Sequence, residues 1–184
     1  MNQKPTKKKV YTYKSGAQYD GEWVGGFRHG YGTQSWPDGA KYDGDWQHGK
    51  AHGKGTFTHV DGDSYFGDWM YDKANGFGKY SHQNGATYEG QWKDDLQDGK
   101  GVEKWGDGSI YDGFYMKGKK HGLGSYKWND GSEYNGEWND NKISGIGIYK
   151  WIDGRMYKGE WLNNNMEGYG FYSWDDGRTF EGQY

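Results

Sequence analysis

An aromatic residue recurs every 23 residues along almost the whole chain, and this period constrains the fold more than any local motif. A second aromatic residue follows four positions after each of them. The first residues of the pairs are Tyr19, Tyr42, Tyr65, Tyr88, Tyr111, Tyr134, Tyr157 and Phe180, and the second residues are Trp23, Trp46, Trp69, Trp92, Tyr115, Trp138, Trp161 and Tyr184. A fixed period without insertions is typical of repeat proteins, in which each unit packs against its neighbours.

The period divides the chain into two parts. Residues 1–9 are predicted to be a basic, flexible N-terminus, because they hold a run of lysines and no part of the repeat. Residues 10–184 are predicted to be one repeat array. The array holds half a repeat, then seven full repeats from Tyr19, and finally the first strand of an eighth.

The composition favours an ordered chain with an unusual core. Hydrophobic residues make up 32% of the sequence and aromatic residues alone make up 20%, so aliphatic side chains are too few for a conventional core. Disordered chains are poor in aromatic residues, whereas here these residues are abundant and periodic. We therefore expect a folded chain that is held together by aromatic packing.

Each repeat has the pattern of two strands joined by a loop. Residues 42–46 and 55–59 alternate at period two, which is typical of strands. The polar stretch from Gln47 to Gly53 is predicted to be the loop between them. Asp-Gly or Asn-Gly pairs such as Asp61-Gly62 follow the second strand and favour tight hairpin turns, and the 35 glycines disfavour helices. The predicted fold is all-β: an elongated, twisted, single-layer antiparallel sheet of 23-residue hairpins that forms a curved trough.

The turn at residues 37–39 predicts the register of the neighbouring strands. With a bulged three-residue turn, Gln34 pairs with Tyr42 and Gly32 pairs with Gly44. Glycine opposite glycine leaves a gap into which large rings can lean, and each ring can bury about 150–250 Å². The same register pairs Lys79 with Glu89 on the opposite, solvated face.

The pattern Tyr-x-Gly-x-Trp, followed by Gly-x-x-His-Gly-x-Gly, resembles the MORN (membrane occupation and recognition nexus) repeat. The fullest match is residues 42–55, YDGDWQHGKAHGKG. The resemblance implies an elongated antiparallel sheet with an aromatic-lined groove, and a role as a scaffold or interaction module. MORN arrays occur in junctophilins, in ciliary radial-spoke proteins and in plant phosphatidylinositol phosphate kinases, where catalysis belongs to attached domains.

Several chemical functions lack support in the sequence. The net charge is −3, which gives no broad basic surface for nucleic acid, and there is no Cys to ligate a metal. His59 and His82 lie one repeat apart and are better explained as substitutes for aromatic residues. No Gly-x-Gly is completed to a dinucleotide fingerprint, and no pair of carboxylates is singled out for acid-base chemistry. We expect no enzyme activity, no cofactor and no metal.

The leading functional hypothesis is a scaffold whose aromatic groove binds an extended or helical segment of a partner protein, because Tyr and Trp are enriched at binding hot spots. The competing interpretation is that these rings are used entirely in internal stacking. The predicted partner-binding residues are Tyr88, Trp92, Trp105, Tyr111, Tyr126, Trp128, Tyr134, Trp138, Tyr149, Trp151, Tyr157, Trp161, Tyr172 and Trp174.

Three alternatives remain open at the level of the sequence. A phospholipid-tethering module would contact acidic lipids through Lys4, Lys7, Lys8 and Lys9. The chain could also be the regulatory segment of a larger phosphatidylinositol phosphate kinase-like protein, or it could self-associate through an open strand edge at Tyr184. No apolar run is long enough to span a membrane, so we expect a cytoplasmic protein, and the family resemblance suggests the cytoskeleton or the cilium.

Overall fold

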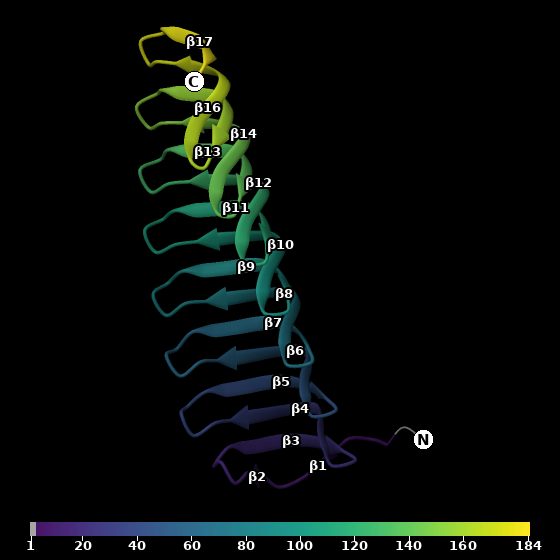
Figure 1. Ribbon diagram of the computed structural model, residues 1–184. Coiled ribbons are helices and arrows are strands. Elements are labelled where there is room, and N and C mark those ends of the chain that lie inside the picture. Colours follow the sequence, from purple (N-terminus) through teal and green to yellow (C-terminus); the bar gives the residue numbers. More distant parts are fainter. Residues whose placement is uncertain (1–2) are drawn as a thin grey trace. The chain divides into compact units, whose positions relative to one another are not determined.

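The computed structural model describes residues 3–184, and these fold into two compact units that meet in sequence between Leu96 and Gln97. Every regular element in the described residues is a β-strand (Figure 1). The strands of the first unit are β1 (Thr6–Lys7), β2 (Tyr11–Thr12), β3 (Gln18–Val24), β4 (Phe27–Ser35), β5 (Lys41–Gln47), β6 (Lys50–Thr58), β7 (Ser64–Met70), β8 (Lys73–Ser81) and β9 (Thr87–Lys93).

The second unit repeats the same alternation of strand lengths. Its strands are β10 (Leu96–Lys104), β11 (Ile110–Met116), β12 (Lys119–Lys127), β13 (Glu133–Asn139), β14 (Lys142–Lys150), β15 (Met156–Leu162), β16 (Asn165–Ser173) and β17 (Thr179–Gln183). Within each unit, from β3 to β9 and from β10 to β17, every strand pairs antiparallel with the next one in the chain. The prediction of an all-β, antiparallel fold built from 23-residue hairpins is confirmed.

The predicted loop from Gln47 to Gly53 is wrong, because most of it is strand. Strand β5 ends at Gln47 and β6 begins at Lys50, so the connection is a two-residue turn. Both turn residues have positive φ, 50° at His48 and 80° at Gly49, which is the geometry of a tight hairpin turn whose twist matches that of its strands. The polar residues beyond the turn are paired strand residues.

The predicted register at the other end of the repeat is confirmed. Gly32 lies opposite Gly44 and Gln34 lies opposite Tyr42, and the turn is closed by the Trp36 N–H, which donates to the Ala40 carbonyl at 2.9 Å. The outer-face pairs are also present, with Lys79 opposite Glu89 and Lys127 opposite Glu133. The Nζ of Lys127 lies 3.7 Å from the Glu133 carboxylate.

The first strand lies within the predicted basic N-terminus. Thr6 and Lys7 form β1, which pairs antiparallel with β3 so that Thr6 lies opposite Trp23. The physical reason is the free edge of β3, which offers unpaired backbone groups to any nearby extended segment. Lys8 also places its ammonium 5.3 Å from the centre of the Trp23 ring.

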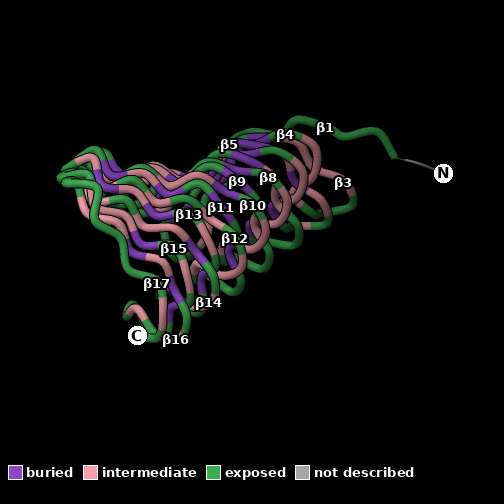
Figure 2. Tube along the Cα trace, turned by 90° about the horizontal axis from the view of Figure 1, so that it is seen from above, coloured by how far each residue is buried: buried purple, intermediate pink, exposed green. Residues whose placement is uncertain are grey.

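The core consists of tyrosine rings that lie over pairs of glycines. A Cβ added to Gly55 would overlap the ring of Tyr42, and a Cβ added to Gly44 would overlap the Gly55 backbone, so this site requires glycine on both strands. The Tyr42 ring is 2% exposed, and its hydroxyl donates to the Asp45 carbonyl at 2.8 Å. Figure 2 shows the buried positions within the strands, whereas the turns are mostly exposed.

Candidate functional site

A groove with a volume of about 710 Å³ opens on the aromatic side of the first unit. Three kinds of side chain line it: aromatic rings, two small alanines, and a few polar or charged groups. The lining residues are Arg28, Gln34, Trp36, Tyr42, Trp46, Ala51, Phe57, His59, Tyr65, Trp69, Asp72, Ala74, Tyr80, Trp92 and Asp95.

A bulge in the sheet brings the alanines into this groove. Between β5 and β6 the register shifts, so that Gly44 lies opposite Gly55 while Trp46 lies opposite Ala51. The next hairpin repeats the shift and places Trp69 opposite Ala74. Both alanines line the groove although only 5% of each is exposed, and their short side chains leave the space between the rings unfilled.

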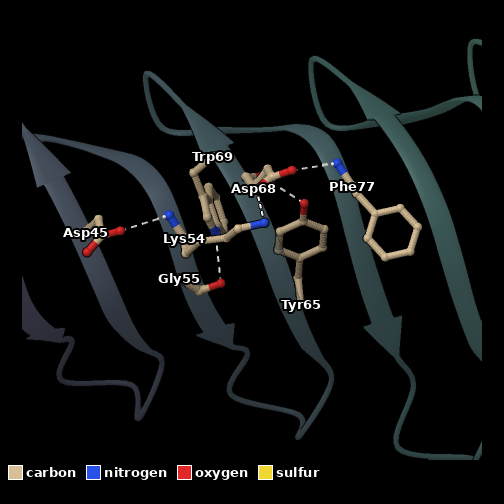
Figure 3. A network of polar contacts seen from close by, with 7 residues as sticks. All are labelled: Asp45, Lys54, Gly55, Tyr65, Asp68, Trp69 and Phe77. Carbon is tan, nitrogen blue, oxygen red and sulfur yellow. Dashed lines mark hydrogen bonds and ion pairs between the residues drawn. The ribbon is translucent and has the colours of Figure 1, made fainter.

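Carboxylates on the outer face hold these bulges in place (Figure 3). Asp45 accepts from the Lys54 N–H at 3.1 Å, and Asp68 accepts from the Phe77 N–H at 2.8 Å. Asp68 also forms an ion pair with the Nζ of Lys54. Burial raises the pKa of Asp68, but the hydrogen bonds from Lys54 and Phe77 outweigh it, so the pKa lies below its ordinary value.

The rings of the groove are fixed by edge-to-face contacts and by hydrogen bonds. The Tyr42 ring lies between two tryptophans, with centroids 5.0 Å from Trp46 and 5.3 Å from Trp69. The indole N–H of Trp46 donates to the Gly32 carbonyl at 3.0 Å, and that of Trp69 donates to the Gly55 carbonyl at 3.0 Å. The rings therefore present a preformed apolar surface that loses little freedom when a ligand binds.

Charged groups of both signs border the groove. The guanidinium of Arg28 lies 4.5 Å from the centre of the Trp46 ring, and it donates to the Gln34 side chain at 3.0 Å and to the Gly49 carbonyl at 2.8 Å. Asp72 and Asp95 lie in two-residue turns, where they accept from the N–H groups of Ala51 at 2.7 Å and Ala74 at 2.8 Å.

In the second unit, larger side chains replace the two alanines. The corresponding positions in the repeat are held by Gln97, Lys120, Ile143 and Met166. Ile143 is 5% exposed and lies opposite Trp138. The Lys120 ammonium lies against aromatic rings, and burial lowers its pKa while the nearby Glu103 carboxylate raises it.

Eleven of the fourteen predicted partner-binding residues fall into two groups. Four tyrosines are at most 1% exposed and form the base on which the other rings pack: Tyr88, Tyr111, Tyr134 and Tyr157. Rings of the second unit form a continuous ladder, with centroids 4.5 Å apart for Tyr126 and Trp128 and 5.0 Å apart for Trp128 and Tyr149. Tyr172 is the buried member of the ladder, and the others are half-buried. The ladder consists of Trp105, Tyr126, Trp128, Tyr149, Trp151, Tyr172 and Trp174.

Of the predicted residues, Trp92 lines the groove of the first unit, whereas Trp138 and Trp161 are buried. Sequence reasoning missed Arg28, the alanine pair and the aspartate pair. The signal in the sequence was the residue type at the repeat position of Arg28. This position holds alanine at 51 and 74, glutamine at 97 and lysine at 120. Aromatic periodicity alone does not distinguish this position.

Neither a cluster of metal-ligating side chains nor a long apolar helix occurs within residues 3–184. No three His, Cys, Asp or Glu side chains in this range are placed to hold a metal ion. None of its segments forms a helix long and apolar enough to cross a bilayer.

Comparison with known proteins identifies a repeat. The MORN repeat profile matches residues 19–41, 42–64, 65–87, 88–110, 111–133, 134–154 and 157–177. No curated protein matches the chain.

Comparison with solved structures finds only distant matches. The TCP domain of SAS-4 (dCPAP) from Drosophila melanogaster, in complex with a proline-rich motif of Ana2 (dSTIL), is 10% identical with a TM-score of 0.49, over 100% of this chain and 97% of that one. A mutant TCP10 domain of CPAP from Danio rerio is 13% identical with a TM-score of 0.44, over 95% and 82%. Virginiamycin B lyase from Staphylococcus aureus is 13% identical with a TM-score of 0.20, over 95% and 54%. At these values the likeness says nothing about activity or partner.

Proposed function

The chain belongs to the MORN repeat family, and on that basis we propose that it is a non-catalytic scaffold whose aromatic groove binds an extended or helical segment of a partner protein. One observation carries the proposal. The first unit holds an open groove of about 710 Å³ whose walls are aromatic rings and whose base is formed in part by alanines. A concave, mostly apolar, preformed surface with a few polar groups is typical of a binding site.

The geometry of the rings supports binding over internal stacking alone. Each tyrosine of the base already has its contacts: Tyr42 packs on two tryptophans and its hydroxyl is hydrogen-bonded. The outer rings, among them Trp36 and Phe57, are only partly buried and line the groove. Partly exposed, rigid aromatic rings bind a partner with a small loss of side-chain entropy.

The ladder of the second unit is proposed as a further contact surface of the same kind. It contains half of the partner-binding residues predicted from the sequence, and Trp128 lies within it between Tyr126 and Tyr149. A cytoplasmic location at the cytoskeleton or the cilium is part of the proposal and rests on the MORN family alone.

A peptide-display selection with the purified chain tests this function. Peptides that bind the wild type are then measured against Ala74→Met, which fills the groove with the side chain that Met166 supplies at the same repeat position, and against Trp128→Ala. We expect at least tenfold weaker binding to one of these variants. Thermal unfolding of both variants controls for loss of the fold.

Binding that is unchanged in both variants would contradict the proposal, because the peptides would then contact neither aromatic surface. A substitution on the solvated face, Lys79→Gln, serves as the matched control and is expected to leave every affinity unchanged.

A second candidate function is the tethering of the chain to acidic phospholipids, favoured by the exposure of Lys4, Lys7, Lys8 and Lys9. Each lysine near an anionic surface contributes about 1 kcal/mol. Sedimentation with phosphatidylserine vesicles tests it, since replacement of all four lysines by glutamine is expected to abolish binding. Vesicle binding that survives this replacement would exclude the basic terminus as the tether.

A further inference from the structure

Two cations of the chain itself occupy the same position of the repeat and lie against aromatic rings. Arg28 and Lys120 are four repeats apart. The guanidinium of Arg28 lies 4.5 Å from the centre of the Trp46 ring and 5.8 Å from that of Tyr13. Cations in this range are attracted by the negative face of the ring.

Four rings surround Lys120. Its Nζ lies 5.3 Å from the ring centre of Trp105, 5.5 Å from Tyr111, 5.8 Å from Tyr126 and 5.9 Å from Trp138. Each ring comes from a different position of the repeat, so the cage is defined by four sequence columns. The position of Lys120 shows that four rings in this arrangement can hold an ammonium group.

The same four columns surround each alanine of the groove. They supply Trp36, Tyr42, Phe57 and Trp69 at Ala51, and His59, Tyr65, Tyr80 and Trp92 at Ala74. All eight of these side chains line the groove.

The spacing of the rings at the two alanines matches that of the occupied cage. The ring from the Tyr111 column lies 5.4 Å from the tryptophan of the next repeat at Lys120, 5.3 Å at Ala51 and 5.2 Å at Ala74. The ring from the Tyr126 column lies 6.0 Å, 6.4 Å and 6.4 Å from that tryptophan. The first unit therefore holds two cages of similar ring spacing, in which an alanine replaces the internal cation.

The charge of the neighbouring turn residue also differs between the Lys120 cage and the two alanine cages. The turn residue that accepts the backbone N–H of the caged position is the neutral Asn141 at Lys120, but it is Asp72 at Ala51 and Asp95 at Ala74. Both aspartates line the groove. At this turn position, a carboxylate thus stands beside each cage that lacks its own cation, whereas a neutral amide stands beside the Lys120 cage, whose nearby carboxylate is Glu103.

We propose that the Ala51 and Ala74 cages each receive a lysine or arginine side chain from an extended segment of a partner protein. These side chains take the place that the internal cations Arg28 and Lys120 occupy at the same position of their own repeats. This inference rests on the proposed function and names the chemistry of its partner. One repeat is two strands, or about 9.6 Å, and three residues of an extended polyproline-type segment span about 9.3 Å. The two basic residues therefore lie three positions apart.

Fluorescence polarisation with labelled synthetic peptides tests the inference. The probe is a proline-rich peptide with two lysines three positions apart, and the matched control carries norleucine at both positions. We expect the lysine peptide to bind at least tenfold more tightly, and a peptide with two adjacent lysines to bind more weakly than the probe. Equal affinity for the lysine and norleucine peptides would overturn the inference.

Variants of the chain test separately how the aspartate charge and the empty space in the cage contribute to binding. Asp72→Asn and Asp95→Asn keep the acceptor for the backbone N–H, as Asn141 does, and each is expected to weaken the lysine peptide at least threefold without changing the norleucine peptide. Ala74→Lys fills the second cage with an internal cation and is expected to weaken the lysine peptide at least tenfold. Unchanged binding of the lysine peptide to all three variants would overturn the inference.

The outcome also distinguishes this inference from the function on which it rests. If peptides selected by display lose affinity for Ala74→Met while the lysine probe does not bind, the groove is a binding site but the cages do not select cations. If no peptide of either kind responds to a change in the groove or in the ladder, both proposals fail.

Discussion

At the scale of single residues, the fold depends on pairs of glycines that face each other across neighbouring strands. Gly44 and Gly55 are such a pair, and the Tyr42 ring lies over both of them. Glycine is required at these positions because a side chain would leave no room for the ring. Backbone freedom is not the reason, since neither glycine has a positive φ. Glycines in the turns, such as Gly39 at φ +97°, have open space around them.

Gly55→Ala is therefore expected to lower the free energy of unfolding by about 3 kcal/mol, since its methyl group displaces the Tyr42 ring in a packed core. Gly39→Ala introduces only a left-handed backbone strain of about 1–2 kcal/mol. Urea denaturation of the two variants measures both losses. Equal losses would show that the close approach of ring and backbone does not matter.

The hydroxyls of the buried tyrosines make a second contribution at this scale. Tyr134 is 0% exposed, and its hydroxyl donates to the Glu137 carbonyl at 2.8 Å. Tyr134→Phe leaves that carbonyl without this donor and is expected to cost about 1 kcal/mol. The exposed Tyr71 gives the matched control, since Tyr71→Phe is expected to leave the unfolding midpoint in urea unchanged.

At the scale of the hairpin, the two-residue turns need residues that accept positive φ. Asn163 and Asn164 adopt φ of 48° and 71°, and the Asn164 side chain also accepts from the Ile143 N–H at 2.9 Å, 21 positions earlier. The turn residue thus ties its own hairpin to the preceding repeat. Asparagine serves both needs because it tolerates left-handed geometry and carries an acceptor.

Two substitutions of Asn164 test separately the left-handed backbone geometry and the side-chain hydrogen bond. Asn164→Gly keeps the backbone geometry and loses the hydrogen bond, which is expected to cost about 1 kcal/mol. Asn164→Ala loses both and is expected to cost about 2–3 kcal/mol. Thermal and urea unfolding give the two values, and an alanine variant as stable as the glycine variant would contradict the role assigned to the backbone.

At the scale of the whole molecule, repetition makes the chain sensitive to alkali. Burial raises the pKa of Tyr19 to about 12, and it raises the pKa of Tyr42, Tyr65, Tyr111 and Tyr134 further. An unfolded tyrosine has a pKa of about 10. Because the folded values are higher, the stabilisation is fully present below about pH 10 and is lost as the pH rises toward the folded values.

We therefore expect cooperative unfolding above about pH 10, in which the core tyrosines ionise together with the loss of β-structure. Parallel titrations by tyrosinate absorbance and by circular dichroism measure the two events. Complete ionisation near pH 10 with the fold intact would contradict the burial of the rings.

The sequence by itself determined the hairpin repeat, its register and its aromatic side. A 23-residue period fixes the order of the strands, Asp-Gly and Asn-Gly pairs fix one turn of each repeat, and glycine columns leave room for the rings. These features follow from short-range rules that act in the same way in every repeat. For that reason the pairing of Gly32 with Gly44 could be predicted without a structure.

Only the tertiary structure decided where the groove lies. The bulge sets Ala51 opposite Trp46 while Gly44 stays opposite Gly55, and it is held by the Asp45 carboxylate, which accepts a backbone N–H from the neighbouring strand. An alternating pattern cannot predict such a shift, because the shift depends on a contact between strands. The cages at Ala51 and Ala74 likewise exist because rings from three successive hairpins converge, and no single repeat of the sequence contains them.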